Sequence, residues 1–81
     1  MSQHCYKVEA IWDSEAQVWV AESNDVPGLV TEANTIEALT DKLRKIIPEL
    51  LYLNNVVADE YVGNITFDLV SHRQELIKVA G

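Results

Sequence analysis

Three side chains have the chemistry of a soft metal ligand or a nucleophile, namely His4, Cys5 and His72. His4 and Cys5 are adjacent, so in a strand their side chains would point to opposite faces of the sheet. Metal sites instead use spacings such as CxxC or HxxxH, which gather several donors around one ion. Cys5 also lacks a neighbouring base, and we expect it to pack as a small, half-buried apolar residue. The sequence therefore predicts no metal site and no cofactor.

Carboxylates are the other candidates for chemistry, since Asp13 with Glu15 and Asp59 with Glu60 could form acid–base pairs. All four lie in predicted turns or loops, and nothing in the sequence indicates the burial that would raise a carboxyl pKa. The GxSxG, HExxH, P-loop and GxGxxG motifs do not occur. We therefore predict that the protein is not an enzyme.

Two further features could bind a ligand. Trp12 and Trp19 fall in neighbouring predicted strands, but a cage for a cation usually needs a third ring and a polar anchor, so we interpret them as packing residues. The predicted helix start at 34–37 could offer free N–H groups to an anion. Glu32 and Glu37 crowd that end and no Lys or Arg is near, so we predict no anion site.

The composition describes one domain, residues 1–81, with 48% hydrophobic residues, as in a globular protein. No apolar run approaches the roughly 20 residues of a transmembrane helix, and the first residues lack a secretory signal pattern. One cysteine cannot form an internal disulfide, which fits a reducing compartment. We expect a cytoplasmic protein without membrane contact.

The net charge is −7, from 13 acidic and 6 basic residues. Such a charge repels phosphate backbones, so we predict no binding of nucleic acid, and it attracts basic proteins. The same charge would also keep a small protein soluble without any partner. Both interpretations remain open on composition alone.

Alternating residues predict the first two strands. Residues 5–12 place one face of a strand in the core, formed by Tyr6, Val8, Ala10 and Trp12. Residues 18–22 form the second strand of a hairpin after a polar turn. We favour the register that sets Lys7 opposite Glu22, because opposite charges attract across strands.

The segment VPGL predicts a type II turn, because Pro27 fixes φ at its second position and Gly28 accepts the positive φ of its third. A short strand, residues 29–33, follows it. Either Asn34 or Thr35 then caps a helix, and Asn34 with Glu37 has the spacing of a capping box.

Residues 35–54 predict an amphipathic helix with an apolar stripe made of Ile36, Leu39, Leu43, Ile46, Ile47 and Leu50. Pro48 falls on the polar side, where water can reach the carbonyl of Arg44 that it leaves unbonded. We therefore expect one helix bent at Pro48. The alternative is a break, with Pro48 opening a second short helix.

Residues 61–71 alternate as a further strand, and residues 75–80 form either a fifth short strand or a loose tail. The order β-β-β-α-β defines an α+β fold, with one mostly antiparallel sheet and a single amphipathic helix on one face. The uncovered face would carry polar residues with a few apolar ones, namely Lys7, Glu9, Ile11, Thr66, Asp68 and Val70.

The hairpin, the turn, the short strand and the opening of the helix together resemble the HicB family of bacterial antitoxins. The matching residues are Trp19, Asp25, Val26, Pro27, Gly28, Thr31, Thr35, Glu37 and Ala38. GLVTEANTIEAL with IPELLYLN is more similar still to a single-domain HicB-like group, the domain of unknown function 1902. The likeness extends from Tyr6 to about Val79.

The resemblance implies a partial ribonuclease-H-like sheet, whose fourth strand lies beside and parallel to the first. It also implies a partner, HicA, a small basic ribonuclease whose surface HicB covers. Many HicB proteins carry a C-terminal DNA-binding module, whereas this sequence ends before one, so we expect no such module here.

We therefore predict an antitoxin-like protein that binds and occludes a basic ribonuclease of the HicA type, and that forms a dimer or a higher homo-oligomer. The alternative is a free-standing homo-oligomeric binding module with another partner. Two acidic surfaces are candidates for the contact, the polar helix side (Glu37, Asp41, Glu49) and the open sheet face with its edges (Glu9, Glu22, Asp68).

Overall fold

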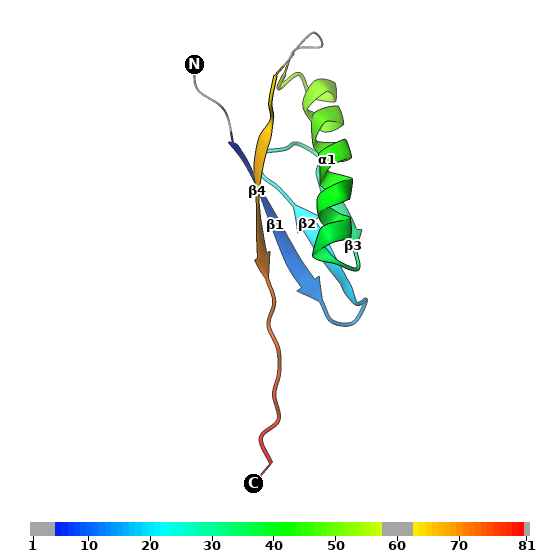
Figure 1. The fold of residues 1–81 in the computed structure, drawn as a ribbon, viewed down its shortest axis with the longest axis vertical. Helices are drawn as coiled ribbons and strands as arrows, with labels where there is room; N and C mark the ends of the chain where they lie inside the picture. The colour runs from blue at the N-terminus through cyan, green and yellow to red at the C-terminus, as the bar shows by residue number, and fades with distance from the viewer. Residues whose placement is uncertain (1–4, 58–62, 81) are drawn as a thin grey trace.

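The computed structural model describes residues 5–57 and 63–80. Along the chain these residues form β1 (Cys5–Asp13), β2 (Val18–Glu22), β3 (Val30–Ala33), α1 (Ile36–Leu53) and β4 (Thr66–His72) (Figure 1). The order β-β-β-α-β and the α+β class are those predicted. His4, Asp59, Glu60 and residues 61–62 lie outside the described residues. The strand expected over 61–71 begins only at Thr66 and ends at His72.

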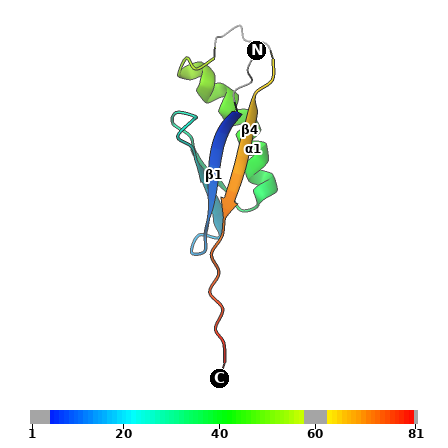
Figure 2. The same cartoon turned by 90° about the vertical axis from the view of Figure 1, so that its left-hand side faces the viewer.

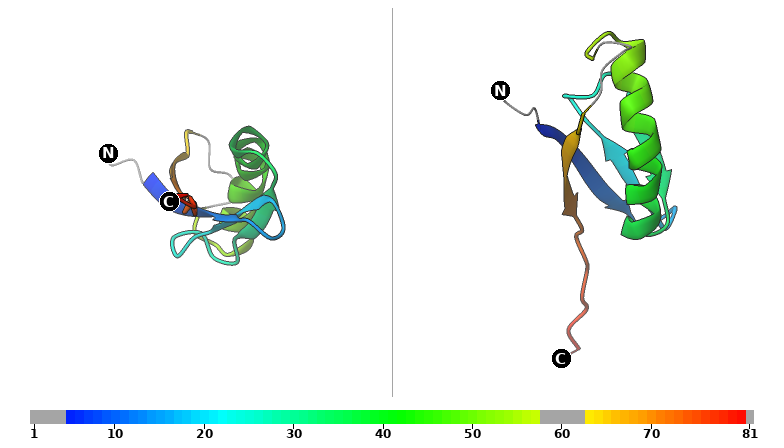
Figure 3. Two further views of the ribbon diagram at one scale, coloured as in Figure 1. Left: turned by 90° about the horizontal axis from the view of Figure 1, so that it is seen from below. Right: turned by 45° about the horizontal axis from the view of Figure 1, so that its top comes forward.

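The strands form one sheet in the order β3-β2-β1-β4. β2 pairs antiparallel with both β1 and β3, while β4 pairs parallel with β1 (Figure 2). A parallel neighbour requires a crossover connection, and α1 supplies it by packing along one face of the sheet (Figure 3). The parallel β1–β4 pair is the arrangement that the family resemblance implied.

The register of the β1–β2 hairpin differs from the expected one. Trp12 pairs with Trp19, and Glu22 stands opposite Glu9 rather than Lys7. The connecting turn is held by Asp13, whose carboxylate accepts hydrogen bonds from the backbone N–H groups of residues 15 and 16 at 3.0 and 3.2 Å. The centroids of the Trp12 and Trp19 rings are 5.3 Å apart. This ring contact and the Asp13 turn stabilise the observed register more than one Lys7–Glu22 charge pair would stabilise the expected register.

The core lies between the sheet and α1. Alternation buries Tyr6, Val8 and Ala10 of β1, as predicted. The helix contributes a stripe that is at most 1% exposed, made of Leu39, Leu43, Ile47 and Leu51. These residues recur every four positions, so their side chains meet the sheet on successive turns.

The two ends of α1 are set by local hydrogen bonds. Thr35 is the N-cap, because its Oγ1 accepts from the backbone N–H of Ala38 at 3.0 Å. Asn34 is therefore not the cap, and the capping box proposed for Asn34 and Glu37 does not form. The helix runs through Pro48 without a break, so the alternative of a second helix opening at Pro48 is wrong.

The turn before β3 has the predicted geometry. Gly28 has a φ of +78°, and the backbone N–H of Leu29 donates to the carbonyl of Val26 at 3.2 Å. Val26 is fully buried, so the turn is anchored in the core. The third residue of this turn needs a positive φ, which glycine adopts most easily, and this is why Gly28 allowed the turn to be predicted from the sequence.

Residues 73–80 form no strand within this chain and run away from the sheet beyond the end of β4 (Figure 1). The fifth strand considered for residues 75–80 is therefore not formed in this chain. The connecting HRQ segment contains no Gly, Pro, Asn or Asp, so it has none of the residues that most favour a chain reversal.

Candidate partner-binding surface

The face of the sheet that α1 leaves uncovered carries charged and apolar side chains together. Figure 2 looks onto it, with α1 behind the strands. We call it the open face and define it by the residues that alternate with the core positions, namely Cys5, Lys7, Glu9, Ile11, Val20, Glu22, Val30, Glu32, Thr66, Asp68, Val70 and His72. It contains three of the six acidic residues predicted to bind a partner.

Like charges meet at the centre of this face. Glu9 of β1 stands directly opposite Glu22 of β2, and both are exposed. The only basic groups among the open-face residues are Lys7 and the imidazole of His72, whose Nε2 lies 3.6 Å from the carboxylate of Glu9. Like charges directly opposite in an antiparallel pair are unfavourable. The sheet therefore carries a local repulsion that a basic group from a partner would relieve.

Asp68, the third predicted residue on this face, has a different setting. It pairs with Lys7 in the β1–β4 register, so an opposite charge already stands beside it. Among the three predicted acidic residues of the open face, Glu9 and Glu22 therefore have the charges that are less well compensated. Glu9, Glu22 and the residues that border them are therefore the part of the open face that we consider as the candidate site.

The loop after β2 shapes one border of the acidic pair. The Ser23 hydroxyl donates to the carbonyl of Lys7 and accepts from the backbone N–H groups of Asp25 and Val26 at 3.0 and 3.2 Å. The Asp25 carboxylate accepts from the backbone N–H of Lys7 at 2.8 Å. These bonds tie the loop to β1, a distance of 16 to 18 residues along the sequence.

Two shallow hollows follow from this loop geometry, with volumes of about 240 and 220 Å³. Both are lined by Glu9, Ser23 and Asn24, the larger also by Glu22 and the smaller also by Lys7 and Asp25. The larger is big enough for the end of a Lys or Arg side chain and presents carboxylate and hydroxyl oxygens to it, whereas Lys7 borders the smaller one. Sequence reasoning did not identify Ser23 or Asn24. The S-x-D pattern, which is typical of a side chain that bonds the backbone two residues on, was the available signal.

The other predicted acidic surface lies on the opposite side of the molecule. Glu37, Asp41 and Glu49 are exposed on the polar side of α1. Asp41 is already paired with Arg44, with Oδ1 and Nη1 2.6 Å apart. Exposed Lys42 and Lys45 share the same helix. The helix side is therefore mixed in charge, whereas the acidic excess gathers on the open face.

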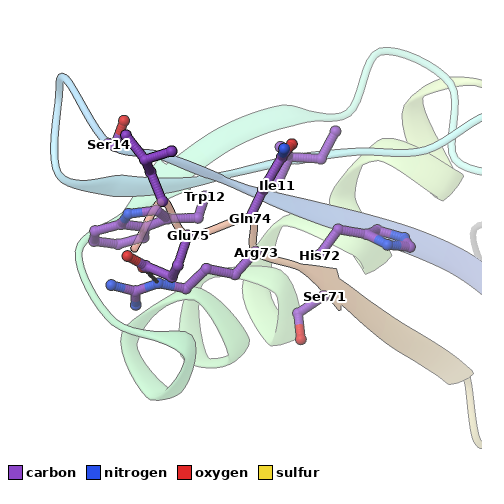
Figure 4. Close-up of a pocket in the computed structure, with 9 residues that line it drawn as sticks. Ile11, Trp12, Ser14, Ser71, His72, Arg73, Gln74 and Glu75 are labelled. Carbon is purple, nitrogen blue, oxygen red and sulfur yellow. Dashed lines mark hydrogen bonds and ion pairs between the residues drawn. The ribbon is translucent and has the colours of Figure 1, made fainter. Parts of the chain in front are cut away.

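A groove at the end of β1 is lined by aromatic, apolar and basic residues rather than by an acidic pair. It has a volume of about 950 Å³ and is lined by residues at the ends of β1 and β4 (Figure 4). The guanidinium of Arg73 stacks over the Trp12 ring at 4.2 Å from its centroid and lies 6.0 Å from that of Trp19. The two tryptophans thus contact each other and the guanidinium of Arg73.

Cys5 differs from its expected setting, because it is exposed on the open face rather than half-buried. Local desolvation, followed by a hydrogen bond to Asp68 and the negative charge of that carboxylate, raises the pKa of the Cys5 thiol. A raised pKa lowers the thiolate fraction, so this cysteine is not activated as a nucleophile. No cluster of three His, Cys, Asp or Glu side chains suited to a metal ion occurs within residues 5–57 and 63–80.

The sequence profile of a domain of unknown function, DUF1902, matches residues 5–80. The chain belongs to the DUF1902 family. A solved relative is the crystal structure of hypothetical protein TTHA1013 from the extremely thermophilic bacterium Thermus thermophilus. The two chains are 43% identical and superpose with a TM-score of 0.69 over 94% of this chain and 100% of that one. Comparison with curated proteins finds no match.

The DUF1902 match covers every element that builds the open face, from β1 to β4, together with residues 73–80. Within the described part of the chain, no helix is long and apolar enough to cross a membrane. The acidic pair of this DUF1902 domain therefore sits on an exposed sheet face of an α+β domain.

Proposed function

We propose that this DUF1902 protein is an antitoxin-like inhibitor that binds a small basic ribonuclease of the HicA type and occludes its substrate-binding surface. The observation that carries the proposal is the opposed pair of Glu9 and Glu22 on an otherwise uncovered sheet face. The HicB-like pattern between Trp19 and Ala38 suggests the class of partner.

The mechanism is occlusion without chemistry. A ribonuclease presents basic side chains to the phosphates of its substrate, and carboxylates can occupy the same positions. The hollow lined by Glu9 and Glu22 gives a Lys or Arg side chain a place to enter the surface. In this mechanism the inhibitor contacts the toxin and not the nucleic acid. Such a role also places the protein in the cytoplasm, where its target would act.

The alternative, a homo-oligomeric binding module with another partner, rests on a different feature of the same face. Ile11, Val30 and Val70 are 52%, 73% and 36% exposed. Apolar side chains beside charged ones are typical of protein interfaces, where an apolar centre is bordered by polar residues. Both functions use the open face, so they differ in the partner rather than in the surface.

Co-expression with each small neighbouring reading frame tests the partner. We expect one neighbour to be toxic when expressed alone, to be neutralised by this protein, and to co-purify with it. If no neighbour is toxic and none co-purifies, the antitoxin proposal is wrong and the homo-oligomeric module takes its place.

Matched charge reversals test the surface. Glu9→Lys with Glu22→Lys should slow association at low salt and flatten its salt dependence, because steering depends on the charge at the contact. Glu37→Lys with Glu49→Lys makes the same change in net charge on the helix side and should leave most of the association rate. Equal losses from both double variants would contradict the assignment to the open face.

A further inference from the structure

Residues 74–80, which we call the arm, have no contact surface within their own chain that buries them. Leu76, Ile77 and Val79 are 87%, 81% and 90% exposed, and every residue of the arm is exposed. The arm extends from β4 away from the domain (Figure 1). Apolar side chains at such exposure in an extended segment are typical of a strand that pairs with another chain.

The strand next to the arm has a free edge. In the sheet order β3-β2-β1-β4, β4 is an edge strand, and among the described residues no strand lies against its outer side. β4 covers Thr66–His72, a segment equal in length to the arm. An exposed edge strand readily accepts an added strand, because its outward N–H and C=O groups have no ladder partner.

We propose that the arm of one copy adds antiparallel to the outer edge of β4 of a second copy, so that two copies exchange arms around a two-fold axis at Arg73. Each arm becomes the fifth strand of the other copy's sheet. A two-fold axis makes the contact self-complementary, since each copy gives an arm and receives one.

The register with Arg73 on the axis matches the side chains on both faces. On the helix side, Phe67 stands opposite Val79, and Leu69 stands opposite Ile77. Phe67 and Leu69 are only partly buried in one copy and would gain apolar neighbours from the arm. Opposed residues of an antiparallel pair point to the same face of the sheet, so the two apolar pairs extend the core.

The open face gains two matched pairs in the same register. Val70, which is 36% exposed, stands opposite Leu76, and Asp68 stands opposite Lys78. An apolar pair and an opposite-charge pair each favour strand association. Lys78 is the only basic residue of the arm, and this register brings it to the only acidic residue of β4.

Neighbouring registers fail. Moving the arm by two residues one way sets Asp68 against Leu76 and Leu69 against Glu75, and moving it two the other way sets Lys78 against Val70. A shift by one residue turns the apolar side chains of the arm to the wrong faces. The sequence of the arm is therefore complementary to β4 in one register.

Arg73 holds the arm in position to leave the domain. Its guanidinium stacks on Trp12 and pairs with the carboxylate of Glu75. These contacts fix the first residues beyond β4 and occupy the Arg73 charge, which would otherwise repel its symmetry mate at the axis. The groove lined by Ile11, Trp12 and Leu76 lies where the arm leaves the domain.

The arm exchange does not depend on the inhibitor function proposed above, because it joins two copies of this chain through β4 and the arm. The inhibitor function uses Glu9 and Glu22 on β1 and β2. A variant that separates the copies can therefore still bind the basic partner, and a protein without any such partner can still dimerise.

Light scattering after size-exclusion chromatography of the full chain tests the arm. We expect a dimer that Ile77→Asp converts to a monomer, because that carboxylate would be buried without a partner beside Leu69. Leu53→Asp makes the same kind of change at a side chain that is 77% exposed at the end of α1 and should leave the dimer intact. A monomeric wild type, or a dimer that survives Ile77→Asp and deletion of residues 74–80, would overturn the proposal.

A charge swap and a crosslink test the register. Asp68→Lys alone and Lys78→Asp alone should each weaken the dimer, and the double variant should restore it. Val70→Cys with Leu76→Cys, in a Cys5→Ser background, should form a covalent dimer on oxidation, because opposed Cα atoms lie within disulfide reach. Val70→Cys with Lys78→Cys should not. No restoration by the swap, or equal crosslinking of both cysteine pairs, would contradict the register.

Discussion

The two faces of one sheet differ in what their residues do, although they alternate along the same strands. On the covered face, Val8 and Ala10 of β1 are fully buried against α1. On the open face, the intervening Glu9 stands opposite Glu22, and Ile11 remains 52% exposed. The covered face is satisfied within the chain and stabilises the fold. The open face keeps two opposed carboxylates and exposed apolar groups that nothing in the described part of the chain covers, and the proposed partner contact rests on these groups.

The largest expected effect comes from the helix residues that cover the sheet. Leu43→Ala should lower the free energy of unfolding by about 2–5 kcal/mol, because Leu43 is fully buried and its truncation leaves a cavity. Denaturant unfolding of the variant measures the loss. Leu53→Ala is the matched control, since Leu53 is 77% exposed on the same helix and should change stability by no more than about 0.5 kcal/mol. Similar losses in both variants would remove the contrast between buried and exposed apolar residues.

An intermediate loss of stability is expected from a substitution of Gly28, which lies between the hollow on the open face and α1. Gly28 lines the hollow beside Glu9 and Glu22, and a Cβ atom built on it lies 3.8 Å from Leu50 of α1. That distance is an ordinary contact, so the cost of Gly28→Ala is the strain of a φ of +78°. We expect a loss of about 1 kcal/mol or more.

Thermal unfolding of Gly28→Ala and Gly28→Asn together identifies the cause. Asn tolerates a left-handed conformation better than Ala does, so it should destabilise the protein less despite its larger side chain. An unchanged melting temperature for Gly28→Ala, or a greater loss with Asn, would show that backbone strain is not the reason for glycine at this position.

The smallest effect has the opposite sign and lies on the open face. Glu22→Lys should raise the free energy of unfolding by a few tenths to about 1 kcal/mol, because it turns the repulsion with Glu9 into an attraction. The gain should shrink as salt is added. The same variant should bind the proposed basic partner more slowly. A loss of stability at low salt would show that Glu22 stabilises the fold. It would contradict the view that only the covered face is arranged for stability.

Most of the fold could be predicted because its signals are local and strong. Alternation in residues 5–12 indicated both faces of β1, and the apolar period of α1 indicated which side of the helix is buried. The Pro27–Gly28 pair indicated the turn. The parallel position of β4 beside β1 was predicted from the family resemblance, because no local sequence pattern indicates which strand a distant segment pairs with.

The candidate site could be predicted only as a set of acidic residues. Sequence placed Glu9 and Glu22 among six equivalent candidates, because every exposed carboxylate looks alike along the chain. The expected Lys7–Glu22 pair would even have neutralised one of them. Ser23 was missed because its role requires β1, whose Lys7 carbonyl accepts its hydroxyl across 16 residues of sequence.

By itself the sequence determined which segments form strands or a helix and which side of each is buried, because period and turn chemistry act over a few residues. Only the tertiary structure decided the hairpin register, the choice of Thr35 as cap, and the separation of the acidic residues into a mixed helix side and an acidic sheet face. These outcomes depend on which side chains meet across the sheet, such as Trp12 with Trp19 and Asp41 with Arg44. The energy of such a pair exists only once the chain has brought its two members together.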